Sequence, residues 1–354
     1  MQELISHQLV RYLEDRGVTH IFGLCGHTNI AVLTALEGST IRFVNTRHEQ
    51  VAAHAADGYA RMRRKAGVVL SHLGPGLTNA ATGVANAALD SIPLVVIAGD
   101  VPTHYFGKHP HQEVNLHADA AQWEIYRPFV KRAWRVDRPD RFPEILEKAF
   151  QLAESGRPGP VLIDVPMDIF SAKVDTSLFE RLRAHTKQLE KPSIDDVLAR
   201  RIVQELLDAE RPVIYAGGGV ILADAAQALA QLVDHLGIPV AHSLMGKGVL
   251  PDDHPLVLGM TGFWGTQFVN DTCRTADLVL GLGTRFAEAD CSSWEDEYTF
   301  SFPPTRLIHI DIDAAEIGRN YPAAIGAVAD VGQALAVLNR VAREICPEPR
   351  PNAA

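Results

Sequence analysis

The chain of 354 residues is long enough for two domains with separate hydrophobic cores, and 47% hydrophobic and 21% charged residues are typical of a soluble globular protein. A formal net charge of -10 argues against a nucleic-acid partner, because phosphate recognition needs a basic field. The N-terminus lacks the basic and apolar regions of a signal peptide, and no apolar run is long enough to cross a bilayer, so we expect a cytoplasmic protein without a membrane partner.

In chain order, residues 1–172 alternate apolar strands, glycine-containing turns and helices, which predicts a first α/β domain with a mainly parallel sheet flanked by helices. The predicted strands cover residues 18–22, 41–44, 66–71, 93–99 and 159–166. The predicted helices cover residues 2–16, 30–36, 77–89 and 141–155, and a further helix begins at Glu49.

The turn over residues 23–29 joins the first predicted strand to a helix. Loops at the carboxyl ends of parallel strands are where ligands bind, so His27 and Asn29 are candidate site residues. The alternative is that Thr28 or Asn29 caps the following helix.

Glu49 lies where a short β-branched strand passes into an alanine-rich helix, at the mouth of the predicted sheet. Because Ala52, Ala53 and Ala56 carry almost no side-chain bulk, another backbone or a flat ligand can approach closely, and we expect this face to pack against another subunit. A carboxylate in a first turn is also favoured by the helix dipole, so the alternative is an ordinary surface residue.

A second glycine turn, Gly74-Pro75-Gly76, lies just beyond His72 and opens the next predicted helix. Two glycines around a proline bring backbone amides close to whatever occupies the mouth of the sheet. For His72 a structural role remains the alternative to a catalytic one.

The segment that follows the strand over residues 93–99 contains four histidines within 14 residues, His104, His109, His111 and His117. Their spacing fits no zinc pattern and acidic ligands are sparse, so we favour a polar substrate loop over a metal site. The four cysteines of the chain form no Cys-x-x-Cys pair, so we expect neither a zinc site nor a disulfide framework.

Residues 173–193 are charged and are predicted to be a partly helical linker, and residues 194–343 to form a second, Rossmann-like α/β domain. Its predicted strands cover residues 212–216, 239–241, 278–282 and 307–312, and its helices residues 195–208, 223–236, 265–274 and 331–343. Gly217-Gly218-Gly219, after the first of these strands, fits either a dinucleotide phosphate or a tight turn. Residues 344–354 are expected to form a mobile tail.

Several short motifs follow one another along the chain. They are Arg47-His48-Glu49-Gln50, Gly58-Tyr59-Ala60-Arg61, Gly74-Pro75-Gly76 with Thr78-Asn79, Ile92-Pro93-Leu94, Gly156-Arg157-Pro158-Gly159-Pro160, and Ile310-Asp311-Ile312-Asp313 with Glu316-Ile317-Gly318. Together they resemble the acetolactate synthase family of thiamine diphosphate enzymes along essentially the whole chain. The resemblance implies a first domain that binds the aminopyrimidine ring of the cofactor and a central domain that sometimes holds FAD.

In that family a glutamate bonded to the aminopyrimidine ring activates the cofactor, and the resemblance gives this role to Glu49, in a fairly dry site. It also implies contacts to the pyrimidine side of thiamine diphosphate; the residues concerned are Gly26, His27, Gly74, Pro75 and Asn79. A histidine at the position of His72 resembles benzoylformate decarboxylase-like relatives, where it serves proton transfer near the reacting carbon.

His111-Gln112-Glu113 resembles the Phe-Gln-Glu of the family, in which the glutamine faces the active site. Histidine in place of phenylalanine departs from that pattern, so His111 and Gln112, with His27 and His72, suggest a 2-oxo acid more polar than pyruvate. FAD is an open alternative: Gly217, Gly218, Arg285 and Asp311 lie where FAD-binding members place contacts, whereas Thr261 departs from the usual histidine-containing motif.

The family's third domain carries Gly-Asp-Gly and, further on, Asn-Asn, which hold magnesium and the diphosphate; neither occurs in this sequence. We therefore expect the large subunit of a split decarboxylase or carboligase, whose partner subunit holds Mg²⁺ and thiamine diphosphate's diphosphate, in a heterotetramer of two chains and two partners. The alternatives are a thiamine diphosphate-dependent hydrolase of a cyclic dione, a non-catalytic regulatory or scaffold subunit, and a truncated piece of a one-chain enzyme.

Overall fold

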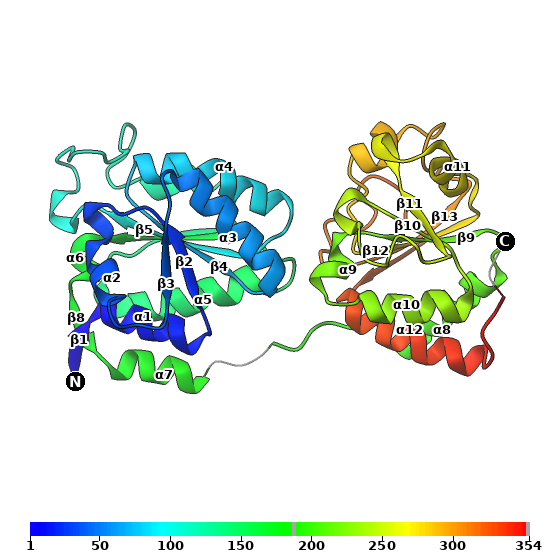
Figure 1. Cartoon of the computed structure of the whole chain (residues 1–354), viewed down its shortest axis with the longest axis horizontal. Coiled ribbons are helices and arrows are strands. Elements are labelled where there is room, and N and C mark those ends of the chain that lie inside the picture. Colours follow the sequence, from blue (N-terminus) through cyan, green and yellow to red (C-terminus); the bar gives the residue numbers. More distant parts are fainter. Residues whose placement is uncertain (186–188, 352–354) are drawn as a thin grey trace. The chain divides into compact units, whose positions relative to one another are not determined.

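The computed structural model describes residues 1–185 and 189–351, which fold into two compact units, Met1–Leu189 and Glu190–Ala354 (Figure 1). Each unit is a parallel sheet with helices on its faces, so the predicted α/β class is confirmed. In the described part of the chain, no helix has the length and apolar character needed to span a membrane.

The sheet of the first unit has six parallel strands in the order β3-β2-β4-β5-β7-β6. The strands are β2 (His20–Gly23), β3 (Arg42–Asn45), β4 (Gly67–Ser71), β5 (Leu94–Asp100), β6 (Arg132–Arg135) and β7 (Val161–Pro166). Every residue of β4, β5 and β7 is buried, as expected for the centre of a parallel sheet. We did not predict β6, because this edge strand has only two apolar residues, which lie between two arginines.

Helices cover both faces of this sheet (Figure 1). Their bounds are α1 (Ile5–Asp15), α2 (Ile30–Ala35), α3 (Glu49–Arg63), α4 (Pro75–Leu89), α5 (Phe142–Glu154), α6 (Met167–Phe170) and α7 (Ser177–His185). The large aromatic core side chains come from α1, α5, α6 and α7; they are Tyr12, Phe142, Phe150, Phe170 and Phe179. The other face of the sheet is covered by α3 and α4.

The alanine face of α3 packs inside the first unit, not on a free surface. Ala52, Ala53 and Ala56 are fully buried, and a Cβ added at Gly83 of α4 would lie 2.6 Å from the Ala53 Cβ. The expectation that this face packs against another subunit is therefore wrong, because α4 of the same chain already covers it.

The predicted linker over residues 173–193 begins too early. β8 (Lys173–Asp175) pairs antiparallel with β1 (Gln2–Leu4), and α7 buries Phe179 completely, so both belong to the first unit. The segment is rich in charged residues and has few apolar ones, so its sequence did not indicate that it packs on the first unit. The pairing also explains why the chain enters α1 from a short strand and not from a longer helix.

The second unit contains another six-stranded parallel sheet, in the order β11-β10-β9-β12-β13-β14. The strands are β9 (Pro212–Ala216), β10 (Val240–His242), β11 (Val257–Met260), β12 (Leu278–Leu282), β13 (Arg306–Asp311) and β14 (Ile325–Val328). Its helices are α8 (Asp196–Asp208), α9 (Gly218–Leu222), α10 (Ala226–Leu236), α11 (Gln267–Thr275) and α12 (Val331–Ile345). We did not predict β11 and β14, which are the two short edge strands.

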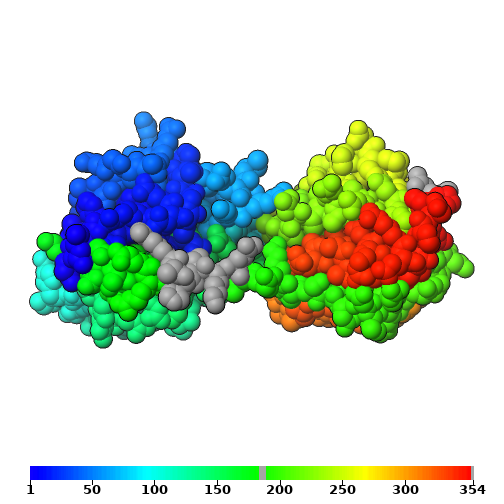
Figure 2. All heavy atoms as spheres, turned by 90° about the horizontal axis from the view of Figure 1, so that it is seen from below, coloured from blue at the N-terminus to red at the C-terminus, as the bar shows by residue number. Residues whose placement is uncertain are grey.

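The C-terminal segment is more ordered than the predicted tail over residues 344–354. α12 extends to Ile345 on the outer surface of the second unit, beside α8 and α10 (Figure 2). Beyond it, the Arg350 N–H donates to the carbonyl of His235 at 2.9 Å, and the His235 Nε2 lies 2.7 Å from the carbonyl of Cys346. Residues 346–351 thus lie against α10, whereas 352–354 are outside the described residues.

Candidate active site

Glu49 is the first residue of α3 and its side chain is buried, with 5% exposure. The Asn79 Nδ2 of α4 donates to Glu49 Oε2 at 3.0 Å. The other carboxylate oxygen, Oε1, has no hydrogen-bond partner among the described residues, and a Cβ at Gly76 would lie 3.5 Å from it. Glu49 is therefore not an ordinary surface residue: it is a buried carboxylate held at one oxygen and open at the other.

The turn Gly74-Pro75-Gly76 begins α4 and passes close to the loop that follows β5. Gly74 has a φ of +31°, and a Cβ there would lie 1.8 Å from the Gln112 carbonyl oxygen. The sequence needs glycine here because the backbone of the loop occupies the space of a side chain. This contact brings Gln112 to the carboxyl end of β4.

His72 directly follows β4 and has a polar partner at each ring nitrogen. The Thr28 Oγ1 lies 2.7 Å from Nδ1, and the Gln112 Oε1 lies 3.2 Å from Nε2. An amide oxygen only accepts, so Nε2 carries the proton and donates to Gln112, while Nδ1 accepts the Thr28 hydroxyl proton; this tautomer is assigned from the partners.

The electrostatic surroundings keep His72 neutral near pH 7. Burial is the main cause that lowers the pKa of His72, and the neighbouring His27 lowers it further, while the Gln112 hydrogen bond and the Glu49 charge act in the opposite direction. The His27 ring meets the His72 ring edge-on, with the centroids 4.6 Å apart. A neutral imidazole of this kind can take up a proton.

The predicted site residues do not all meet. The structure brings Glu49, Asn79, His72, His27 and Gln112 to one edge of the first sheet. The side chain of His111 is exposed and, in the part of the chain that the structure describes, makes no hydrogen bond, ion pair or ring contact.

In the turn over residues 23–29, some residues hold the turn itself and others contact His72 in the candidate site. The Asn29 side chain accepts from the Gly26 N–H at 3.0 Å and donates to the Leu24 carbonyl at 3.1 Å, so it holds the turn itself. Gly26 makes room for the neighbouring His72 ring, since a Cβ there would lie 2.4 Å from the His72 Cγ. Thr28, which we treated only as a capping residue, holds the His72 ring instead.

The model of the thiamine pyrophosphate enzyme N-terminal TPP-binding domain matches residues 5–121, and the model of the thiamine pyrophosphate enzyme central domain matches residues 199–338. The chain belongs to the thiamine pyrophosphate enzyme family. The resemblance inferred from the motifs is thereby confirmed.

Curated relatives extend the comparison. The chain is 38% identical over 332 residues to a probable acetolactate synthase large subunit of Methanocaldococcus jannaschii, covering 93% of this chain and 54% of the relative. It is 39% identical over 337 residues to the acetolactate synthase isozyme 3 large subunit of Escherichia coli, covering 93% and 56%, and 39% identical over 336 residues to a chloroplastic acetolactate synthase of Arabidopsis thaliana, covering 94% and 48%. The chain thus spans about half the length of these relatives.

The residues of the first unit fit the aminopyrimidine side of the cofactor that gives the family its name. The open oxygen of Glu49 leaves one hydrogen-bonding position on a buried carboxylate, as a ring nitrogen would require, and Gly76 leaves the space beside it free of a side chain. The Glu49 charge also contributes, after burial, to raising the pKa of the Tyr126 hydroxyl beneath the turn, which donates to the Leu77 carbonyl at 2.7 Å.

The glycines of the second unit are explained by packing within the chain. A Cβ at Gly217 would lie 2.2 Å from the Gly283 carbonyl oxygen, and one at Gly218 would lie 3.0 Å from the Met245 Cβ. Asp311 Oδ1 accepts the Asp313 N–H at 2.9 Å, and the Arg285 side chain is half-buried. These contacts require the glycines whether or not a flavin binds, so the triplet carries no argument for FAD.

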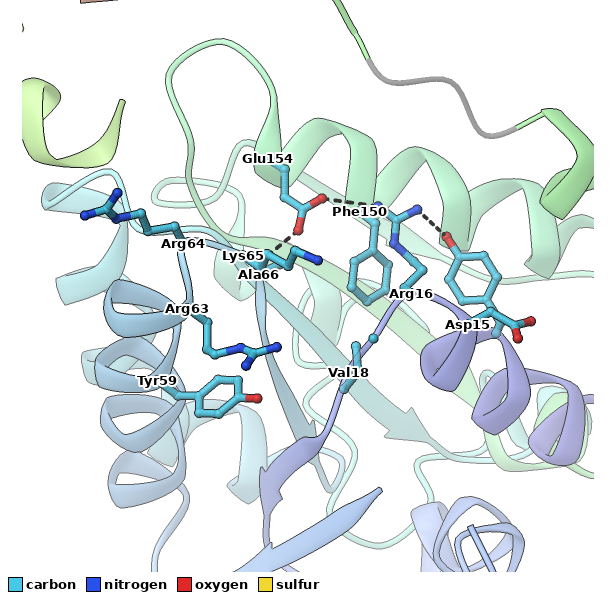
Figure 3. A pocket seen from close by; sticks show the side chains of 12 residues that line it. Asp15, Arg16, Val18, Tyr59, Arg63, Arg64, Lys65, Ala66, Phe150 and Glu154 are labelled. Atoms are coloured by element: carbon cyan, nitrogen blue, oxygen red, sulfur yellow. Dashed lines mark hydrogen bonds and ion pairs between the residues drawn. The ribbon is translucent and has the colours of Figure 1, made fainter. Parts of the chain in front are cut away.

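A cavity of about 470 Å³ lies at the other edge of the first sheet, beside residues that precede β2 and β4 (Figure 3). Arg16 spans it, paired with Glu154 at 3.1 Å, and Glu154 also accepts the Ala66 N–H at 2.9 Å. None of the predicted site residues lines this cavity. Across residues 1–185 and 189–351, no group of three or more histidine, cysteine, aspartate or glutamate side chains could hold a metal ion.

Proposed function

We propose that this chain supplies the pyrimidine side of a thiamine diphosphate site in an enzyme that decarboxylates 2-oxo acids or joins their products, similar to acetolactate synthase. The observation that carries the proposal is Glu49, a buried carboxylate that Asn79 holds at Oε2 and that is open at Oε1. Relatives of this chain are named acetolactate synthase large subunits, which supports the reaction class.

When bound, thiamine diphosphate supplies a nucleophilic carbon that adds to the 2-oxo group and accepts the electrons left by carbon dioxide. Glu49 would exchange a proton with the pyrimidine ring nitrogen through Oε1. Asn79 fixes the orientation of that carboxylate, because its Nδ2 holds the opposite oxygen. The burial of the Glu49 side chain limits the access of water to this proton exchange.

His72 is the proposed proton carrier on the substrate side. Its neutral ring takes a proton at Nδ1, the nitrogen that accepts from the Thr28 hydroxyl, while Nε2 stays bonded to Gln112. His27 and Gln112 add polar groups beside it, which favours a 2-oxo acid with a polar substituent over pyruvate. His111 is proposed for the outer part of the same loop, because its side chain is exposed.

The diphosphate side is proposed to come from a second polypeptide with Gly-Asp-Gly and Asn-Asn motifs, which would hold Mg²⁺ and the phosphates. Support comes from the names of relatives, several of which are called large subunits and therefore imply a partner subunit. Two chains with two partners, a heterotetramer, is the simplest closed assembly.

Reconstitution tests the proposal. The chain is mixed with a separately produced diphosphate-binding domain, thiamine diphosphate and Mg²⁺, and carbon dioxide release is measured over a panel of 2-oxo acids. We expect activity in the mixture, a loss of roughly hundredfold or more for Glu49→Gln, and none for the exposed control Glu37→Gln. Equal activity for Glu49→Gln would overturn the proposal and favour a scaffold subunit.

The same mixture separates the alternatives. Cleavage of a cyclic dione without carbon dioxide release would identify a carbon–carbon hydrolase. Visible flavin absorbance in the purified complex would identify FAD, with Gly217, Gly218, Arg285 and Asp311 as its proposed contacts.

A further inference from the structure

Two carboxyl groups with no role in the proposed reaction lie side by side beneath the site. Asp100 ends β5 and Asp164 lies on the neighbouring strand β7, and both are fully buried. Asp100 Oδ1 accepts the Val101 N–H at 2.7 Å, whereas Asp100 Oδ2 and Asp164 Oδ2 are buried and have no hydrogen-bond partner among the described residues while both acids are ionised. A proton held between the two carboxyls satisfies both atoms.

The charges around the pair fix the number of protons. Burial raises the pKa of Asp100 to about 6 and raises the pKa of Asp164 as well; Glu113 raises that of Asp100, and Arg135 lowers both. The raised pKa values of both acids favour the state in which Asp164 and Asp100 share one proton. The pair carries one negative charge, facing Arg135 and Glu113.

The Gln122 side chain bonds to this carboxyl pair, and its amide group has only one orientation that satisfies its partners. Its Nε2 donates to Asp164 Oδ1 at 2.7 Å and approaches the Gly99 carbonyl at 3.4 Å, so its Oε1 is left to accept the Gly74 N–H at 2.9 Å. Gln122 is fully buried, and a reversed amide would place two donors against each other at Gly74.

Both backbone groups that Gln122 holds lead to His72. Gly74 packs against the backbone of Gln112, whose amide bonds His72 Nε2. Gly99 packs against Thr28, since a Cβ at Gly99 would lie 2.4 Å from the Thr28 Oγ1 that bonds His72 Nδ1. The two residues that bond His72, Gln112 and Thr28, therefore each pack against a glycine. The backbone of each of these glycines is in turn bonded by the Gln122 amide.

We propose that Gln122, oriented by the Asp100–Asp164 carboxyl pair, is a positioning residue for His72. It fixes the Gly74 turn and the end of β5, and through them the Gln112 amide and the Thr28 hydroxyl. Only the catalytic consequence of this positioning depends on the proposed function.

Variants that exchange the hydrogen-bond donor and acceptor between Gln122 and Asp164 test the proposal. Gln122→Met removes all three hydrogen bonds of the amide with little change of volume. Gln122→Glu keeps an acceptor for Gly74 but sets a third carboxylate against the pair. The double variant Gln122→Glu/Asp164→Asn restores a donor that faces an acceptor, because the new amide at position 164 donates to the new carboxylate at position 122. Asp100 then holds the proton, so the three side chains together keep one negative charge. Asp164→Asn alone is the matched control, since an amide imitates the protonated acid.

Two measurements on the isolated full chain read the result: hydrogen exchange of the Gly74 amide, and the titration of the His72 ring followed by NMR on isotope-labelled protein. We expect Gln122→Met to speed Gly74 exchange about tenfold, the loss of one net hydrogen bond, and to move the His72 midpoint towards the ordinary value of histidine. Gln122→Glu should do the same near pH 8, whereas the double variant and Asp164→Asn should resemble the wild type.

The proposal is overturned if Gln122→Met leaves both readouts unchanged, or if the double variant is no closer to the wild type than Gln122→Glu. The comparison of the double variant with Gln122→Glu can be made even if Gln122→Met fails to fold. In the reconstituted complex, the variants should lower kcat in the same order with little change in KM. An inactive wild-type complex would count against the proposed function alone, because the two NMR readouts need only this chain.

Discussion

The two glycine turns of the molecule share a local pattern and differ in what surrounds them. Gly74-Pro75-Gly76 follows β4, and its missing side chains leave space for the Gln112 backbone and for Glu49 Oε1. Gly217-Gly218-Gly219 follows β9, and its missing side chains leave space for Gly283, Thr284 and Met245. Close approach of backbone explains the glycines in both turns. A glycine turn therefore indicates a site only when titratable side chains converge on it, as they do in the first unit.

The largest effect should come from filling the first turn. Gly74→Ala puts a Cβ into the Gln112 carbonyl at a φ of +31°, which should lower the free energy of unfolding by roughly 3 kcal/mol and displace the loop. Gly217→Ala clashes with the Gly283 carbonyl and should be similarly destabilising. Denaturant unfolding and the His72 titration separate the two: only Gly74→Ala should move the titration. If Gly217→Ala also moved it, the contrast between the turns would fail.

The next effect concerns the proposed proton carrier. His72→Phe should lower kcat of the reconstituted enzyme roughly hundredfold, the usual contribution of a general acid–base group. Thr28→Val should be milder and should change the pH profile. The Thr28 hydroxyl donates to unprotonated Nδ1 and so favours the neutral ring; its removal should raise the pKa of His72 and shift the acid limb to higher pH. A shift to lower pH would contradict the assigned tautomer.

A third prediction concerns the pH dependence of stability. The pKa of Asp100 is about 6 in the folded chain, raised by burial from its ordinary 3.8, so the folded state binds this proton more tightly. The resulting stabilisation is complete below the unfolded pKa and is lost as pH rises through about 6. Between about pH 4 and about pH 8, the wild type should lose about 2 to 3 kcal/mol relative to Asp100→Asn. The exposed Asp253→Asn should track the wild type, and a constant difference would contradict the raised pKa.

The smallest effect should be a gain. Gly58 lies inside α3, and a Cβ there would meet nothing within 4 Å. Gly58→Ala should therefore raise the free energy of unfolding by roughly 0.5 to 1 kcal/mol, because alanine favours the helix. Chemical denaturation measures the change. A loss of stability would show that this exposed position is constrained by something other than the helix.

The fold class and the position of Glu49 could be predicted because they rest on local patterns. Apolar strands, glycine turns and amphipathic helices repeat along the chain, and Glu49 begins the helix that follows one of the strands. Segments with weak local patterns were missed: β6 has only two apolar residues between two arginines, and β8 and α7 have few apolar residues among charged ones.

The site itself was only partly predictable, for a different reason. Thr28, His72 and Gln112 are far apart in sequence, and only the folded loop brings them together. Gln122 and the Asp100–Asp164 pair carry no motif, and their roles depend on which amide atom faces which partner. Hydrogen-bond direction between distant residues leaves no periodic signal in a sequence.

The most direct test of the central claim is the rate at which the thiazolium carbon of thiamine diphosphate exchanges its proton with deuterated solvent in the reconstituted complex, followed by NMR. If Glu49 activates the cofactor, the wild type and Glu37→Gln should exchange on the order of a hundredfold or more faster than Glu49→Gln. Equal exchange rates in Glu49→Gln and the wild type would show that the buried carboxylate between Asn79 and Gly76 does not activate the cofactor.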